Sequence, residues 1–274
     1  MRFSLCNEVL REMSFGAQCD FAAALGYDGL EIAPFTLASD PRAITPADTA
    51  EIRRTLTDAG LACSSLHWLL VSPEGLSITT DDARVRRETV DVLRRCVDLA
   101  AELGAEALVH GSPKQRMLPD GGEAAARARA AECLRAAAEA AEAARVTYCI
   151  EPLARDETNF VTTVDEAAEL VAQIGSPAFR TMVDCAATGR NGEAPAALLD
   201  RTLPGGLIAH VQVNDPSRRG PGEGEMRFAP VLGTLKRHGY AGWVAVEPFV
   251  YVPDGPACAA RSLGYLKGVW EGLA

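Results

Sequence analysis

The sequence predicts an α/β fold in which eight parallel strands close into a (β/α)8 TIM barrel, a single domain over residues 1–274. Short apolar runs alternate along the whole chain with amphipathic or alanine-rich segments, which is the pattern of repeated strand–helix units. Eight such runs occur, the strand number of the closed barrel. No segment rich in Pro, Gly or Ser divides the chain, and barrels of this length occur as one domain.

The runs expected to form strands are short and consist mainly of β-branched or other apolar residues. In chain order they are 3–7, 29–32, 62–67, 107–110, 146–151, 181–184, 207–213 and 243–247. Loops rich in Pro and Gly follow several of them, near residues 72, 119 and 215. Because the loops after the strands build the active face of a barrel, function is expected there.

Helix signals lie between these strands. Thr45 before Pro46 is an N-cap followed by a first-turn proline, and the helix that begins there is expected to end before Gly60. The segment 81–104 places apolar residues on one face and ends at a C-cap glycine. Further helices are expected over 122–144, 164–174, 229–238 and 257–273.

The composition is that of a globular protein, with 48% hydrophobic and 23% charged residues. The 27 Lys and Arg against 37 Asp and Glu give a net charge of −10, which argues against a nucleic-acid or anionic membrane partner. The eight cysteines form no C-x-x-C pair, so reduced thiols and a cytoplasmic location are expected. No signal-peptide pattern and no stretch apolar enough to span a membrane is found.

Each expected strand carries a polar or ionisable residue at, or next to, its C-terminal end. These residues are Asn7 with Glu8, Glu31, His67, His110, Glu151, Asp184, Gln212 with His210 two residues earlier, and Glu247. Catalytic groups of a barrel come from the C-terminal ends of several strands. The set therefore predicts an active site at one mouth of the barrel.

Three of these residues, Glu151, Asp184 and Glu247, are carboxylates that follow apolar runs. Converging carboxylates repel one another, so at least one has to take up a proton unless a cation is bound. Hard divalent cations prefer oxygen ligands, and one such ion is expected here. The seventh strand should add a neutral ligand, and both His210 and Gln212 are candidates because they point to the same side.

These residues and their surroundings resemble the xylose isomerase-like barrel superfamily of sugar isomerases and epimerases. The resemblance covers the whole chain and lies in IEPLARDETNFVTT around Glu151, MVD ending at Asp184, HVQVNDPSRRGPGEGE from His210 and VAVEPF around Glu247. It implies one divalent ion, Mn²⁺ or Mg²⁺ with Co²⁺ or Zn²⁺ as alternatives, bound by Glu151, Asp184, Glu247 and a strand-seven residue. It also implies that the two glutamates act as the catalytic acid and base.

The seventh strand departs from the ketose epimerases of this superfamily, which carry His-x-His there. Their metal-binding second His, six residues before an Arg, corresponds to Gln212, because Arg218 follows six residues later. Hydroxypyruvate isomerases are more similar at this point, with His-x-Gln and a following PGxGE. Gln212 is therefore expected as the fourth ligand through its amide oxygen, with His210 as the alternative.

A second departure lies three residues after Asp184, where ketose epimerases have a substrate-binding His and this chain has Ala187. Glu157 and Arg218 match their substrate-binding Glu and Arg. Loop cations suit a substrate carboxylate, so a small unphosphorylated oxo-sugar or oxo-acid is expected as the partner. The expected substrate-binding residues are Glu157, Arg218, His67, His110, Glu31, Lys114 and His210, with Arg116 and Arg219 as further cations.

The reaction implied is isomerisation or epimerisation by proton transfer through a metal-bound enediolate, with the metal as a Lewis acid. A metal-dependent lyase, a dehydratase or decarboxylase of an oxo-sugar acid, would use the same site and stays open. A non-catalytic binding barrel is the alternative outside enzymes, although it would be expected to lose a carboxylate. An abasic-site endonuclease needs a basic face and more His ligands than four His supply. A homodimer or a homotetramer is left open as the assembly.

Overall fold

The computed structural model describes residues 1–273, and its centre is a closed barrel of parallel strands in sequence order. The strands are β1 (Arg2–Cys6), β2 (Gly29–Ile32), β3 (Ala62–Leu66), β4 (Ala107–His110), β5 (Thr147–Ile150), β6 (Phe179–Asp184), β7 (Ile208–Val213) and β8 (Trp243–Val246). The first and last strands pair with each other as well as with their sequence neighbours, which closes the sheet. The predicted TIM barrel is confirmed.

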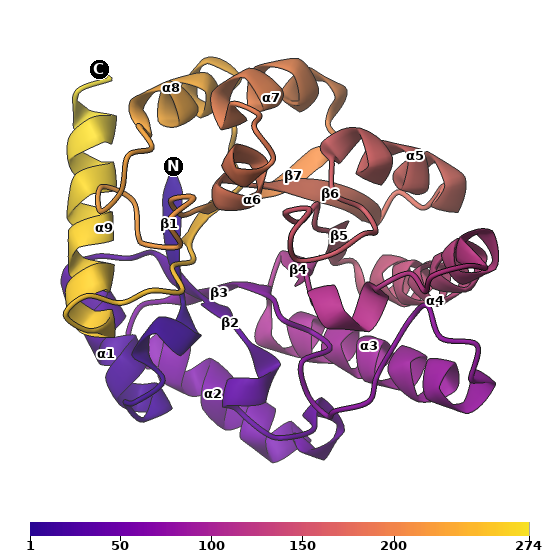
Figure 1. The fold of residues 1–274 in the computed structure, drawn as a ribbon. Coiled ribbons are helices and arrows are strands. Elements are labelled where there is room, and N and C mark those ends of the chain that lie inside the picture. The colour runs from indigo at the N-terminus through magenta and orange to yellow at the C-terminus, as the bar shows by residue number, and fades with distance from the viewer. Residues whose placement is uncertain (274) are drawn as a thin grey trace.

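The longer helices form an outer layer around the barrel, as Figure 1 shows, and one short helix follows β6 at the barrel mouth. They are α1 (Phe15–Leu25), α2 (Pro46–Asp58), α3 (Ala83–Leu103), α4 (Glu123–Ala144), α5 (Val164–Ile174), α6 (Cys185–Arg190), α7 (Pro195–Thr202), α8 (Ala229–Arg237) and α9 (Gly255–Glu271). The N-terminal α1 lies beside the C-terminal α9, so the first and last helices of the chain are neighbours where the barrel closes.

Local sequence starts and stops several helices as predicted. Thr45 and Asp48 form a capping box at the start of α2, in which the Asp48 carboxylate accepts from Thr45 N at 2.8 Å and Thr45 Oγ1 accepts from Asp48 N at 3.2 Å. Gly104 and Gly175 end α3 and α5 with φ angles of 75° and 72°. Glycine adopts this left-handed conformation without a steric cost, so these positions end the helices sharply.

Three helices go beyond the sequence-based expectation, namely α1, α6 and α7. Helix α1 has its own boundary signals, since Ser14 caps its start and Gly26 ends it with a φ of 90°. Helix α6 begins directly after Asp184, its N-cap, and its 6 residues are too few for an amphipathic pattern to show. Helix α9 starts at Gly255, two residues before the expected position, with Asp254 as its N-cap.

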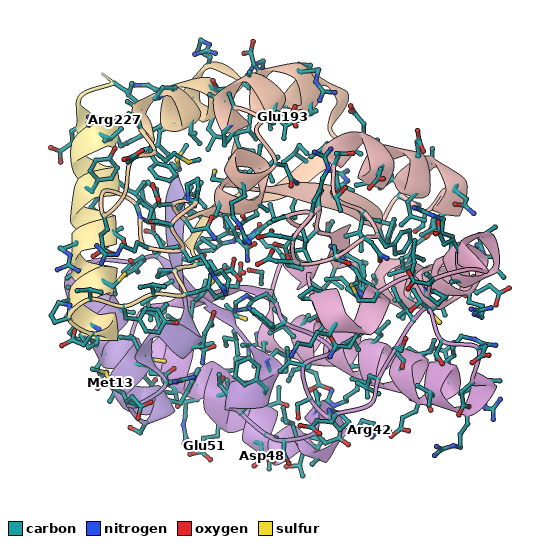
Figure 2. All side chains as sticks on the ribbon, viewed as in Figure 1. Met13, Arg42, Asp48, Glu51, Glu193 and Arg227 are labelled. Carbon is teal, nitrogen blue, oxygen red and sulfur yellow. The ribbon has the colours of Figure 1, made fainter. Side chains whose placement is uncertain are left out.

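Apolar side chains of the strands and helices pack between the barrel wall and the helical layer, with Leu5, Leu30 and Leu99 among those completely buried. Charged side chains lie mainly outside, as the exposed Arg42 and Glu51 do at the edge of the molecule in Figure 2. The polar residues buried inside the barrel are the exception to this distribution, and they point to function.

Among residues 1–273, every helix is too short or too polar to cross a membrane.

Candidate active site

A cavity of about 550 Å³, part of it open to solvent, lies at the C-terminal ends of strands β3 to β8. Its wall is built from residues at these strand ends and in the segments that follow them, as in barrel enzymes generally. They are His67, Trp68, Gly111, Ser112, Pro113, Glu151, Leu153, Glu157, Asp184, Ala186, Ala187, Arg190, Asn214, Arg218, Glu247 and Phe249. The cavity therefore lies at the predicted mouth of the barrel.

Three buried carboxylates from different strands meet in this cavity. Glu151, Asp184 and Glu247 each offer one oxygen, and these oxygens lie within 4.8 Å of one another. Burial raises the pKa of Asp184 to about 6 and that of Glu247 to about 8. Burial, together with the charges of Glu247 and Asp184, also raises the pKa of Glu151 well above its ordinary value. This cluster carries more negative charge than its surroundings balance, which a proton or a divalent cation would relieve.

The segments that follow β6 and β7 orient the side chain of Asp184. Its Oδ1 accepts from Ala187 N at 2.6 Å at the start of α6, whereas Oδ2 is buried without a hydrogen-bond partner in residues 1–273. Asn214, directly after β7, accepts from Ala186 N at 2.9 Å and donates to the carbonyl oxygen of Glu247 at 3.1 Å. Asn214 thus connects the segments that carry Asp184 and Glu247.

Glu151 follows β5 and leans over the backbone after β4. A Cβ atom at Gly111 would lie 2.3 Å from Glu151 Oε2, so glycine leaves the room that this carboxylate occupies. Arg116 is completely buried and donates to the carbonyl oxygens of Glu151 at 2.7 Å and Val161 at 3.3 Å. Its guanidinium therefore holds the backbone around β5 and is occupied inside the protein, away from any substrate.

The seventh strand places Gln212 level with Asp184, because the two residues are register partners in β6 and β7. Gln212 Nε2 donates to Glu31 Oε1 at 2.5 Å, and Gln212 Oε1 has no hydrogen-bond partner among the described residues. His210 pairs with Met182, which puts it one layer deeper, and its Nε2 lies 2.5 Å from Glu31 Oε2. Both side chains are buried below the cavity, where Gln212 has a free amide oxygen and His210 faces Glu31.

Glu31 is the centre of the polar layer beneath the cavity. It is completely buried and accepts from Ser65 Oγ at 2.5 Å in addition to its contacts with Gln212 and His210. Burial alone would raise its pKa, but His210 and His67 hold the pKa of Glu31 at about 2. Glu31 is thus an ionised support of the barrel interior and lies off the cavity wall.

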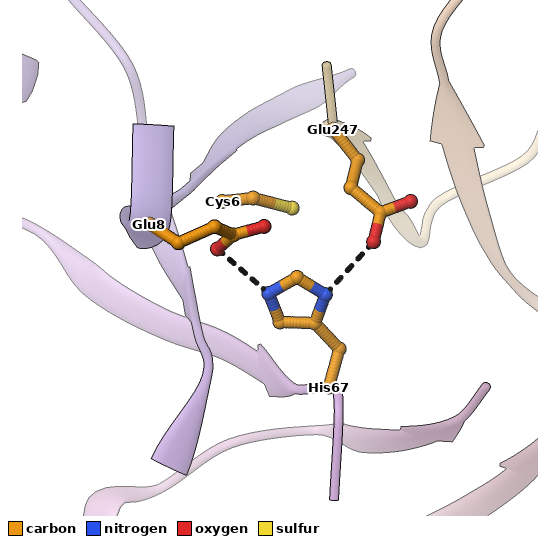
Figure 3. Close-up of side chains that lie close together, drawn as sticks. All are labelled: Cys6, Glu8, His67 and Glu247. Carbon is orange, nitrogen blue, oxygen red and sulfur yellow. Dashed lines mark hydrogen bonds and ion pairs between the residues drawn. The ribbon is translucent and has the colours of Figure 1, made fainter. Parts of the chain in front are cut away.

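His67 follows β3 and lies between two carboxylates, as Figure 3 shows. Its Nδ1 is 3.0 Å from Glu247 Oε1, and its Nε2 is 3.0 Å from Glu8 Oε2. Burial lowers the pKa of His67, but Glu8 and Glu31 outweigh burial, so the pKa lies well above its ordinary value. His67 is on the cavity wall, while Glu8 lies behind it and off the wall.

The outer part of the cavity combines two arginines with two aromatic rings. Arg190 binds Glu157 at 2.8 Å and also pairs with the neighbouring Asp156. Arg218 has no carboxylate partner among residues 1–273 and lies over the ring of Phe249, 4.9 Å from its centroid. Phe249 in turn meets Trp68 edge to face, and these rings provide a flat apolar wall.

Two further residues expected to bind substrate lie away from the cavity. His110 is completely buried, and its Nδ1 is 2.6 Å from the hydroxyl of Tyr148. Burial, with the charge of Arg116, lowers the pKa of His110 to about 3, so its ring is neutral. Lys114 is exposed and absent from the cavity wall. These positions do not favour direct contact between either side chain and a substrate in the cavity.

Sequence reasoning missed three contributors to the site, Arg190, Asn214 and Gly111. Asn214 lies two residues after Gln212, so the alternation of strand side chains was a usable signal for it. Arg190 carries no such signal, because the unpredicted helix α6 brings it to the cavity. Gly111 follows His110 at a strand end, where close backbone approach is a known reason for glycine.

Comparisons with known proteins identify the family to which this chain is similar. The xylose isomerase-like TIM barrel family matches residues 19–269 of the chain. The fructoselysine 3-epimerase of Shigella flexneri is 25% identical over 253 residues, which cover 88% of this chain and 87% of that protein. A putative hydroxypyruvate isomerase of Streptomyces coelicolor is 27% identical over 264 residues, 89% of this chain and 88% of that protein.

Among solved structures, a D-psicose 3-epimerase crystallised in the presence of D-fructose superimposes with a TM-score of 0.83. It covers 98% of this chain and 99% of its own, at 21% sequence identity, and so supports the fold. The relatives found by sequence are named epimerases and isomerases, which makes this protein an enzyme of that class. With the barrel, the three converging carboxylates and a match over most of its length, the chain belongs to the xylose isomerase-like TIM barrel family.

Proposed function

We propose that this protein is a divalent-metal-dependent epimerase or isomerase of a small oxo-sugar or oxo-acid, with Glu151 and Glu247 as its acid–base pair. The observation that carries the proposal is the meeting of three buried carboxylates from β5, β6 and β8 in one cavity. The sugar epimerases among its relatives support this reaction class. The eight free, buried cysteines support a cytoplasmic location.

The residues of the cavity fit a divalent cation such as Mn²⁺ or Mg²⁺. Glu151, Asp184 and Glu247 offer oxygens close together, and buried Asp184 Oδ2 and Gln212 Oε1 have no other partner in residues 1–273. Oxygen donors of this kind are the preferred ligands of hard cations. We assign Gln212 as the fourth ligand over His210, because His210 Nε2 already faces Glu31. A bound ion would supply Lewis-acid polarisation of a substrate carbonyl.

The protein's own residues would perform the proton transfer. One glutamate, in its ionised form, removes the proton next to the substrate carbonyl, leaving an enediolate. A proton donated to the same carbon from the opposite face by the other, protonated glutamate inverts that carbon, whereas a proton delivered to the neighbouring carbon isomerises the substrate. Glu151 and Glu247 suit these roles because both lie on the cavity wall, directly after the different strands β5 and β8.

A screen for proton exchange in deuterated water would test the proposal. The protein, loaded with Mn²⁺ or Mg²⁺, would be incubated with small ketoses, hydroxypyruvate, other 2-oxo acids and keto-inositols. We expect one deuterium to enter the carbon next to the carbonyl of at least one of these substrates. Absence of exchange in all of them, with metal bound, would contradict the proposed function. Loss of water or of carbon dioxide from the substrate would instead identify a lyase.

A separate prediction concerns Arg218 and its preference for a charged substrate. Its guanidinium reaches the cavity without a carboxylate partner, so it is available to a substrate carboxylate. We expect Arg218→Gln to lower kcat/KM for hydroxypyruvate at least roughly tenfold, because a charged hydrogen bond contributes about 1.5–3 kcal/mol. The effect on neutral fructose should be clearly smaller.

Lys114→Gln is the matched control for this experiment, since Lys114 is exposed and off the wall, and it should leave both rates unchanged. Steady-state assays of hydroxypyruvate beside fructose, tagatose and psicose would give the comparison. A higher kcat/KM for a neutral ketohexose in the parent protein would show that the cavity does not select a carboxylate.

The tight fit of Glu151 over Gly111 predicts an effect of a single added methyl group. The Cβ of Gly111→Ala would lie too close to Glu151 Oε2, so the carboxylate must swing aside. Because the far end of a side chain moves easily, we expect a small loss of stability but a loss of activity of about 10²-fold, as for a catalytic group misplaced by about 1 Å. Gly264→Ala, in helix α9 with open space around its Cβ, is the control. Thermal unfolding and exchange rates would separate the two effects, and an unchanged rate in Gly111→Ala would contradict the assigned position of Glu151.

A further inference from the structure

His67 joins two carboxylates that lie on opposite sides of its ring, and only one of them belongs to the cavity. Figure 3 shows Glu8 facing one ring nitrogen and Glu247 facing the other. Among residues 1–273, His67 is the only hydrogen-bond partner of the Glu247 carboxylate. Glu247 Oε1 is therefore held by His67, while Oε2 makes no hydrogen bond and is available to the cavity.

Glu8 contacts His67 on the side of the ring that faces away from Glu247. It lies in the short 3₁₀ helix Asn7–Leu10 after β1, is only 7% exposed and is absent from the cavity wall. One of its oxygens is bound to His67 Nε2, and the other has no hydrogen-bond partner in the described part of the chain. A substrate in the cavity would not touch Glu8, so Glu8 can act on the reaction only indirectly, through its contact with His67 or through the effect of its charge on Glu247.

These three side chains and Cys6 also lie close enough together to be considered as ligands of a metal ion. The orientation of the ring argues against a single ion bound by all of them. Each carboxylate faces a different nitrogen of one imidazole, and an ion can bind only one nitrogen lone pair of that ring (Figure 3). The contacts are those of a histidine bridging two carboxylates.

We propose that Glu8 and His67 are a positioning pair for Glu247: His67 anchors one oxygen of Glu247, and Glu8 fixes the His67 ring from the side away from the cavity. Residues that orient the groups of a metal or catalytic site typically contribute 10- to 100-fold to affinity or activity. The kinetic consequence rests on the proposed function, whereas the structural consequence does not.

The experiment compares Glu8→Ala and Glu8→Gln with Glu12→Ala, an exposed acidic residue of the following turn that serves as control. In crystal structures, we expect the Glu247 carboxylate to leave its position in Glu8→Ala and to keep it in the other two variants. In exchange assays, Glu8→Ala should lose about 10- to 100-fold in kcat with KM largely unchanged. Glu8→Gln should recover most of this loss, because its amide oxygen can still accept from His67 Nε2.

Several results would overturn the positioning pair. An unmoved Glu247 together with an unchanged kcat in Glu8→Ala would show that the pair does not orient it, and a loss confined to KM would indicate contact with substrate. Native mass spectrometry of the parent with Zn²⁺ that finds two ions, one of them lost in Cys6→Ser, would replace the bridge with a metal site. If the parent exchanges no substrate, the proposed function fails, and the position of Glu247 in the crystals still decides the pair.

Discussion

Glu247→Gln is expected to keep the barrel fold and to lose a factor of about 10² to 10⁴ in the rate of substrate proton exchange, the typical contribution of one acid–base residue. The amide has nearly the same volume as the carboxyl and can still accept from His67, so the packing around β8 is preserved. An amide cannot take up and return a proton, however, and it is a weaker ligand for a divalent cation. Both effects act in the same direction.

Exchange would be followed by mass spectrometry of the substrate in deuterated water, with circular dichroism to check the fold. Glu225→Gln is the matched control, because Glu225 is exposed in the loop after β7 and lies off the cavity wall. It should retain the parent rate. A Glu247→Gln variant that exchanges as fast as the parent would remove Glu247 from the mechanism.

Removal of divalent cations is the second change for which a near-complete loss of activity is expected. Without a cation, the charges of Glu151, Asp184 and Glu247 oppose one another, and at least one of them holds a proton near neutral pH. Dialysis against a chelator should abolish exchange, and Mn²⁺ or Mg²⁺ should restore it. Full activity in protein from which elemental analysis detects no metal would contradict the metal-dependent mechanism.

The pH dependence of stability gives this prediction an independent check. The folded-state pKa values of Asp184, about 6, and Glu247, about 8, are raised above those of the unfolded chain, so the folded state binds these protons more tightly. The contribution of these two carboxyls to the stability of the metal-free protein should therefore be largest below about pH 4 and be lost as the pH rises through these values. A cation that binds the ionised carboxylates should raise Tm more at pH 8 than at pH 5.5, because it needs them deprotonated. Thermal unfolding with and without Mn²⁺ at the two pH values would measure this difference.

The sequence predicted the carboxylates of the site because strand ends are local features. Glu151, Asp184 and Glu247 each follow an apolar run, and parallel strands bring their C-terminal ends to one mouth whatever the details of packing. The positions of the loop side chains could not be predicted in this way. In the short helix Pro113–Arg116, Lys114 points to solvent whereas Arg116, two residues later, is completely buried against backbone carbonyls. Both are cations in one loop, and sequence alone could not assign them to opposite environments.

By itself, the sequence of this protein determined the closed parallel barrel, the strand ends and the convergence of the acidic residues at one mouth, because these follow from periodicity and turn signals that act over a few residues. Only the tertiary structure decided which polar residues reach the cavity and which support it from below. Glu31 and His210 lie in a buried layer, Glu8 reaches Glu247 through His67, and Arg190 reaches Glu157 from α6. These contacts join strands and helices far apart in the chain, and their charges are balanced by partners that no local pattern identifies.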